Sequence, residues 1–251
     1  MAGADVVRRW RWIAGSLGCV LLLLASAHAQ MPDKFTNLQF FPKDIAKKQL
    51  IDTMRGFSFA LGVRCERCHV QSADKKMDFA SDDKQEKKTA RMMLRMVSAI
   101  NGDYVSKIPG DKPVQVECVT CHRGIPQPRT LNSMLMDTIT TKDVSAAVAQ
   151  YRELRKKYYG GAQYDFGETP LNILTEALMA KDRSKDAAAI MELNLEVNQP
   201  ASGWALHLAG MSHRAAGEND KAKKNYEDAL KLNPEDGWAK SQLAELSKGP
   251  Q

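Results

Sequence analysis

The sequence has few aromatic residues, few glycines and a single long hydrophobic run. Aromatic residues make up 7% of the chain and glycine 16 of its 251 residues, which excludes a glycine-rich fibre or linker. Hydrophobic residues at 43% and charged residues at 26% are ordinary globular usage, so a wholly disordered chain is excluded as well. Because the only long apolar run lies near the N-terminus, a multi-span membrane protein does not fit. The net charge of +6 is modest and dispersed, which argues against a dedicated nucleic-acid-binding protein.

Residues 1–29 are typical of a secretory signal peptide. Arg8, Arg9 and Arg11 precede an apolar stretch at 12–27, and the small-x-small pattern of a cleavage site ends at Ala29. The stretch is shorter than the ~20 apolar residues of a spanning helix. We therefore expect cleavage after Ala29 and a periplasmic protein, either free or at the periplasmic face of the inner membrane. An uncleaved N-terminal anchor is the alternative.

Beyond the signal, all four cysteines belong to one motif that occurs twice. The motif is Cys-x-x-Cys-His, which is typical of covalent c-type haem attachment. Two thiols at this spacing can form thioethers with the vinyl groups of one porphyrin, and the adjacent histidine can bind the iron from the proximal side. The sequence therefore predicts two haem c groups, bound covalently through Cys65 and Cys68 and through Cys118 and Cys121, with His69 and His122 as the proximal iron ligands.

Three other uses of the cysteines are weaker. A four-cysteine zinc site joins pairs about 15–20 residues apart, whereas 49 residues separate Cys68 from Cys118. Disulfides suit an exported chain but leave the histidine after each pair unexplained. A thioredoxin-like pair needs a strand–helix–strand context, and no strand pattern surrounds either motif.

Methionine is the expected sixth ligand of the first haem iron. His28 leaves with the signal peptide, and His207 and His213 lie in a distant region. A helix is predicted over 44–61, capped by Asp44 and ended by Gly62. Met54 lies on its apolar stripe, eleven residues before the first motif, and is the candidate ligand. The alternative is that this methionine only packs in a core.

A second helix is predicted over 84–100, before the second motif. Five basic residues share one face, and four apolar residues share the other, among them Met93 and Met96. Periodicity alone does not choose between these two methionines as the second distal ligand. The basic face could pair with haem propionates, steer an acidic redox partner, or simply be solvated. Its members are Lys84, Lys87, Lys88, Arg91 and Arg95.

Two successive units of methionine-bearing helix, turn and Cys-x-x-Cys-His resemble the cytochrome subunit of photosynthetic reaction centres. The resemblance covers roughly residues 37–128, and its most specific segments are 53–54, 62–65, 90–97 and 121–124. It implies a helical methionine as distal ligand, and it favours Met96, which lies 22 residues before Cys118, with Met93 as the runner-up. Well-known members of the family bind four haems, whereas this chain carries two motifs. A respiratory complex is therefore an alternative to a membrane reaction centre as the redox partner.

The C-terminal region is predicted to be helical and weakly repetitive. A helix is expected over 143–158, and from residue 169 three positions recur 34 residues later: Asp186, Ala188 and Pro200 as Asp220, Ala222 and Pro234. The region resembles two tetratricopeptide hairpins, the first degenerate, with a final helix over about 236–246. The alternative is a plain helical hairpin without a partner. His207 and His213 are expected to have surface or core roles rather than to bind metal.

The sequence thus predicts a mainly α fold of four segments: a signal peptide at 1–29, a two-haem cytochrome c domain at 30–128, a linker and bridging helix at 129–168, and tetratricopeptide-like hairpins at 169–248. The expected function is electron transfer between redox proteins at relatively positive potentials, with a further protein partner at the repeats, because a methionine ligand raises the potential. Enzyme activity is not expected, since six-coordinate iron has no open site. A two-haem peroxidase with one open iron and a haem-sensing adaptor are the alternatives.

Overall fold

The computed structural model describes residues 32, 34–74, 76–110 and 114–248. The predicted signal peptide lies outside these residues. Within them the structure contains ten α-helices and one sheet of two short strands, which confirms the predicted mainly α fold. The described helices include none with the length and apolar character needed to cross a membrane.

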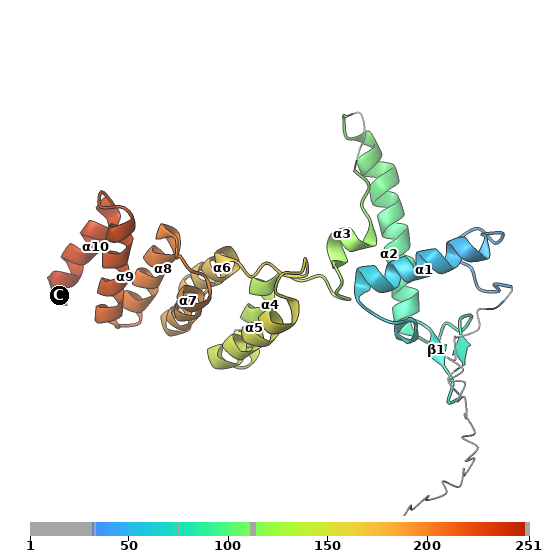
Figure 1. The fold of residues 1–251 in the computed structure, drawn as a ribbon, viewed down its shortest axis with the longest axis horizontal. Coiled ribbons are helices and arrows are strands. Elements are labelled where there is room, and N and C mark those ends of the chain that lie inside the picture. Colours follow the sequence, from blue (N-terminus) through green and yellow to red (C-terminus); the bar gives the residue numbers. More distant parts are fainter. Residues whose placement is uncertain (1–31, 33, 75, 111–113, 249–251) are drawn as a thin grey trace, which may run out of the picture.

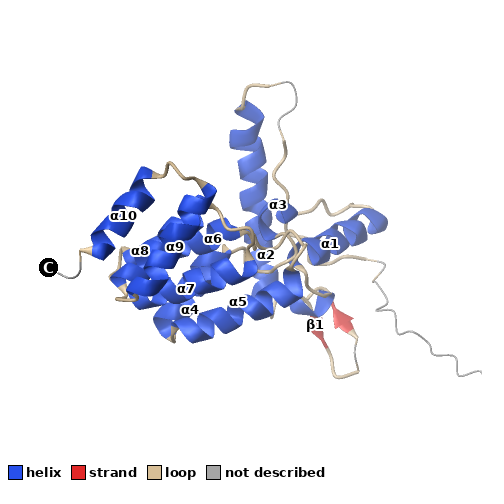
Figure 2. Cartoon of the chain, turned by 60° about the vertical axis from the view of Figure 1, so that its left-hand side comes forward, coloured by secondary structure: helices blue, strands red, loops and turns tan. Residues whose placement is uncertain are grey.

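The chain forms two lobes joined by the segment 123–130 (Figure 1). The N-terminal lobe contains α1 (Lys47–Leu61), the 3-10 turn η1 (Cys65–Arg67), β1 (Val70–Gln71), β2 (Met77–Asp78), α2 (Gln85–Ala99) and α3 (Cys118–His122). The strands pair antiparallel, with Val70 opposite Asp78. Helix α2 crosses behind α1 in Figure 1, and it projects well beyond α3 (Figures 1 and 2).

The C-terminal lobe is a stack of antiparallel helices (Figures 1 and 2). It comprises α4 (Leu131–Thr141), α5 (Val144–Tyr158), α6 (Glu168–Met179), α7 (Ser184–Val197), α8 (Gly203–Ala215), α9 (Asn219–Leu232) and α10 (Gly237–Ser247). Leu135 of α4, Tyr151 of α5 and Leu174 of α6 lie in one buried cluster. The helix expected over 143–158 is therefore not isolated, because it shares a core with its neighbours on both sides.

The predicted boundaries of the two long helices in the N-terminal lobe agree with the structure at Gly62 and differ from it at Asp44 and Asn101. Gly62 ends α1 as expected, in the left-handed conformation with φ of 63°. Asp44 does not cap α1, because residues 42–45 form a turn closed by Ile45 N–H donating to the Pro42 carbonyl, and the helix begins at Lys47. Helix α2 does not stop at Asn101; it continues as a π-helical turn, η2 (Ile100–Tyr104), because the Asn101 side chain holds the backbone of Val116 through two hydrogen bonds of 2.8 Å.

Candidate haem sites

The two Cys-x-x-Cys-His motifs, 49 residues apart in sequence, line one cavity of about 820 Å³. Its walls come from the chain before α1 and from α1, the β-hairpin, α2 and α3. Among the predicted site residues, the cavity lining includes Met54, Cys65, Cys68, His69, Cys118 and His122. Met93, the alternative distal ligand, also lines the cavity. The structure therefore gathers both candidate proximal histidines and two candidate methionines around a single space.

The first motif follows directly from the end of α1. The left-handed Gly62 turns the chain, Arg64 is extended, and Cys65–Arg67 forms the single 3-10 turn η1. The backbone N–H of His69 donates to the Cys65 carbonyl at 3.0 Å, which brings the histidine back beside the first cysteine. This tight turn holds the backbone of His69 against that of Cys65.

The second motif forms a short helix of its own, α3. Glu117 and Thr120 make a capping box at its start, in which each side chain accepts a hydrogen bond from the other residue's backbone N–H. His122 is buried, and its Nδ1 lies 3.0 Å from the Ile125 carbonyl oxygen. Assigning the ring hydrogen to Nδ1 on this contact leaves the Nε2 lone pair available to a metal.

The environment of His69 also suits a metal ligand. Its Nδ1 is buried and has no hydrogen-bond partner within the part of the chain that the structure describes. The ring packs edge-on against Phe79, with 5.0 Å between ring centroids. Burial, followed by the charge of Lys87, holds the pKa of His69 below its ordinary value. The imidazole is thus kept neutral, which is the form that binds iron.

The four motif cysteines are free thiols. Burial raises the pKa of the Cys68 thiol and of the Cys118 thiol, so neither is activated as a thiolate. Across the described ranges the cysteines do not converge into a group that could hold a metal ion by themselves. The structure therefore offers no support for the zinc or disulfide alternatives.

The two motif units are joined at the ends of α1 and α3. Gly124 N–H, two residues after His122, donates to the Ala60 carbonyl in the last turn of α1 at 2.9 Å. A Cβ atom at Gly62 would lie only 2.1 Å from the Gly124 carbonyl oxygen, so the two backbones meet where a side chain would not fit. This junction positions the second motif relative to the helix that precedes the first.

The basic face of α2 differs from the sequence expectation. Lys87 is buried and Arg91 is nearly so, and both line the cavity on the side where Met93 lies. Lys84 donates from Nζ to the Glu66 carbonyl, inside the first motif, at 2.7 Å. Lys88 and Arg95 are exposed. The five cations therefore do not form one solvated face. Lys84 contacts the first motif, and Lys87 and Arg91 contact the loop that follows β2.

The candidate distal ligands lie in different settings. Met54 and Met93 are partly buried and line the cavity, whereas Met96 lies outside its lining and is 45% exposed. Helical periodicity placed Met93 and Met96 on the same face of α2, but only Met93 of the two lines the cavity. Only the packing of α2 against the loop after β2 reveals this difference.

His207 and His213 make polar contacts within the C-terminal lobe. His207 Nε2 lies 2.6 Å from an Asp236 carboxylate oxygen, and His213 Nδ1 lies 2.6 Å from Glu218. Lys221 bridges Glu192 at 2.6 Å and Glu218 at 3.1 Å, so an ammonium group already neutralises the carboxylates beside His213. These contacts hold helices together and agree with the expected core and surface roles.

Comparison with known proteins identifies the family. The family model described as photosynthetic reaction centre cytochrome C subunit matches residues 31–189, which is more than half of the chain. The chain belongs to this family. A tetratricopeptide repeat model matches residues 203–246, the second and better-preserved hairpin with the final helix. The predicted resemblance to both is confirmed.

One curated relative is cytochrome c-554 of Chloroflexus aurantiacus. It is 39% identical over 69 residues, which cover 28% of this chain and 16% of the relative. The chain thus matches much less than two thirds of that protein. Membership in a cytochrome c family implies covalently bound haem c, and the donor set fits this cofactor: paired free thiols, a neutral, partly buried imidazole with an unpartnered nitrogen, and an apolar cavity.

Proposed function

We propose that this protein is an exported c-type cytochrome that holds two haems and carries electrons between redox proteins. The observation that carries the proposal is the cavity that Cys65, Cys68 and Cys118 line together with His69 and His122. When bound, haem c supplies one-electron chemistry at its iron. Cys65 and Cys68 would hold the first haem, and Cys118 and Cys121 the second.

The protein's own part is to fix the ligands and exclude water. The Ile125 carbonyl orients His122 through Nδ1, and edge-on packing by Phe79 orients His69. We propose Met54 as the distal ligand of the first haem and Met96 as that of the second, with Met93 as the alternative. The cavity position of Met93 supports that alternative, and the family spacing supports Met96.

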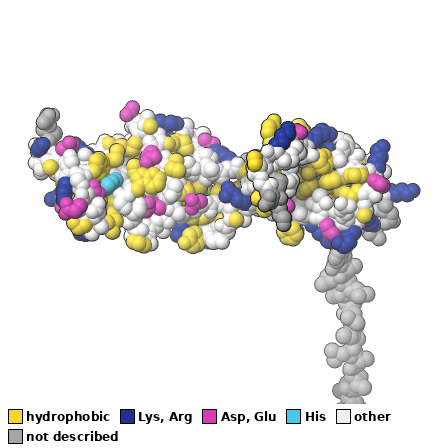
Figure 3. All heavy atoms as spheres, turned by 90° about the horizontal axis from the view of Figure 1, so that it is seen from above, with side chains coloured by type: hydrophobic (Ala, Val, Ile, Leu, Met, Phe, Trp, Pro, Cys, Tyr) yellow, Lys and Arg dark blue, Asp and Glu magenta, His cyan; other side chains and the backbone are white. Residues whose placement is uncertain are grey.

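Export, the redox partner and the domain limits belong to the same proposal. The signal pattern at 1–29 supports a periplasmic location, and the family supports either a membrane reaction centre or a respiratory complex as partner. The limits proposed are 30–128 for the haem domain, 129–168 for the linker and bridging helix, and 169–248 for the repeats. Figure 3 shows hydrophobic side chains gathered on one face of the C-terminal lobe. The exposure of Ile173, Trp204 and Met211 on α6 and α8 supports a protein partner at these helices.

Haem attachment is tested on protein purified from an exporting host. We expect the pyridine haemochrome assay and the intact mass to give two porphyrins per chain and cleavage after Ala29. The double variant Cys65→Ala/Cys68→Ala should retain one porphyrin, and so should Cys118→Ala/Cys121→Ala. A chain that carries no porphyrin after correct maturation would overturn the proposal.

Distal ligation is tested by methionine variants of the full chain. Met54→Ala should abolish the methionine–iron charge-transfer band of one haem, and Met96→Ala that of the other. The matched control is Met92→Ala, since Met92 lies on the same helix as Met96 and is 55% exposed. Loss of the second band in Met93→Ala alone would assign Met93 instead. A high-spin, five-coordinate iron in the unmodified protein would favour the two-haem peroxidase.

A further inference from the structure

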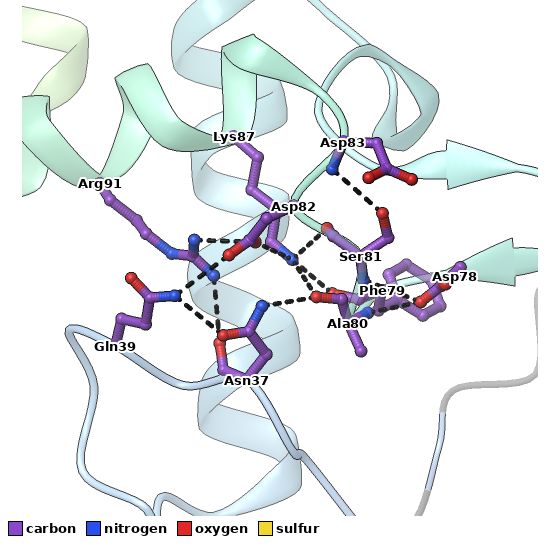
Figure 4. A network of polar contacts seen from close by, with 10 residues as sticks. All are labelled: Asn37, Gln39, Asp78, Phe79, Ala80, Ser81, Asp82, Asp83, Lys87 and Arg91. Carbon is purple, nitrogen blue, oxygen red and sulfur yellow. Dashed lines mark hydrogen bonds and ion pairs between the residues drawn. The ribbon is translucent and has the colours of Figure 1, made fainter.

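A polar network joins α2 to the loop that follows β2, on one wall of the cavity (Figure 4). At its centre, the Lys87 ammonium donates to three consecutive backbone carbonyls at 2.7–3.0 Å, those of Phe79, Ala80 and Ser81. The same nitrogen lies 3.1 Å from a carboxylate oxygen of Asp82. A lysine side chain that is only 10% exposed is rare, and its burial here is permitted because its donors are satisfied.

Arg91 adds a second buried cation one turn further along α2. Its guanidinium lies 2.8 Å from the Asp82 carboxylate and donates to the Asn37 carbonyl at 3.2 Å, and its side chain is 12% exposed. Gln39 also donates to Asp82, at 3.1 Å. The paired cations and hydrogen bonds hold the pKa of Asp82 well below its usual range, so that carboxyl is ionised.

The three least exposed charged groups of the network carry one positive charge in excess. Lys87 and Arg91 contribute two cations, and Asp82 contributes one anion with which both are paired. Asp78 and Asp83, the other carboxylates drawn in Figure 4, are both exposed, so water screens their charges, and Asp78 is also bonded to the backbone N–H groups of Ala80 and Ser81. The loop that the network holds includes Phe79, whose ring packs on His69.

We infer that Lys87 is a positioning and tuning residue of the first haem: it fixes the Phe79 loop against His69 and raises the reduction potential through its buried charge. This inference rests on the proposed function. Reduction adds one electron to the site, and a cation nearby in a poorly solvated setting stabilises the reduced state relative to the oxidised state. Asp82 acts in the opposite sense, since it cancels part of that positive charge.

The test is a redox titration of full-length holoprotein variants, with the first haem isolated by the Cys118→Ala/Cys121→Ala background. Lys87→Met should lower the first potential by the equivalent of about a tenfold change in the redox equilibrium, which is ~59 mV for one electron. Asp82→Asn should raise it. Lys88→Met is the matched control, because it removes the same charge from the exposed side of the same helix and should change the potential much less.

The opposite signs separate tuning from simple damage. If either substitution merely opened the loop to water, both variants would shift the potential in the same direction, and that result would overturn the inference. Equal shifts in Lys87→Met and Lys88→Met would also overturn it, since burial would then be irrelevant. If Lys87→Met does not fold, the Asp82→Asn shift relative to the unmodified chain decides the matter. Absence of haem in the unmodified chain would instead refute the proposed function.

Discussion

The junction between α1 and α3 predicts that replacing glycine by alanine lowers the stability of the N-terminal lobe at Gly62 and raises it at Gly56. Gly62 has φ of +63°, and a Cβ atom there would lie 2.1 Å from the carbonyl oxygen of Gly124. A non-glycine residue in this conformation costs about 1–2 kcal/mol. The clash is with backbone, so it cannot be relieved by a side-chain rotation.

The displacement that relieves the clash also affects a hydrogen bond. Moving Gly124 away from α1 breaks its N–H contact with the Ala60 carbonyl, at a net cost of about 1 kcal/mol. Gly62→Ala should therefore destabilise the N-terminal lobe by about 2–3 kcal/mol. Gly56, six residues earlier on α1, has open space around its Cβ position. Gly56→Ala should stabilise the lobe by up to about 1 kcal/mol, because alanine has the higher helix propensity.

The assay is urea unfolding of the holoprotein followed by two probes. The haem absorption band reports the N-terminal lobe. Within the described residues the tryptophans are Trp204 and Trp238, so their fluorescence reports the C-terminal lobe. We expect Gly62→Ala to shift only the haem-detected transition to lower urea and Gly56→Ala to shift it to higher urea. A Gly62→Ala protein as stable as the unmodified chain would show that the α1–α3 junction does not contribute to stability. Equal shifts of both probes would show that its effect is not confined to the N-terminal lobe.

Three further predictions concern the α8–α9 crossing. A Cβ atom at Gly210 would lie 2.0 Å from the Tyr226 ring. Gly210→Ala should therefore destabilise the C-terminal lobe, as detected by tryptophan fluorescence, by about 1–3 kcal/mol, although alanine has the better helix propensity. No change in stability would show that the two helices pack less closely at this crossing. The Tyr226 hydroxyl is buried without a hydrogen-bond partner in the described residues, so Tyr226→Phe should stabilise the lobe by about 1 kcal/mol. Burial raises the pKa of Tyr226 to about 12, whereas the unfolded value is about 10, so its contribution to stability is intact below pH ~10 and is lost as the pH rises toward 12. An identical alkaline loss in the phenylalanine variant would contradict this assignment.

Local signals in the chain were enough to predict several elements. The two motifs indicated haem attachment because the spacing of cysteine and histidine is set by the porphyrin, not by the rest of the fold. Gly62 predicted the end of α1, since only a residue tolerant of positive φ closes a helix in that way. The 34-residue recurrence predicted the tetratricopeptide-like hairpin that the repeat model matches at 203–246. Helix α4, which has no capping side chain, was not foreseen.

Periodicity and short spacing were enough to predict the mainly α fold and the family, and they indicated which residue types would hold haem. The fold was needed to show that Lys87 is buried, that Met93 lines the cavity, and that Gly124 donates to Ala60. Each of these depends on groups distant in the sequence. A lysine can be buried only where the fold brings it enough acceptors, and helical periodicity describes the face of one helix without stating what packs against it.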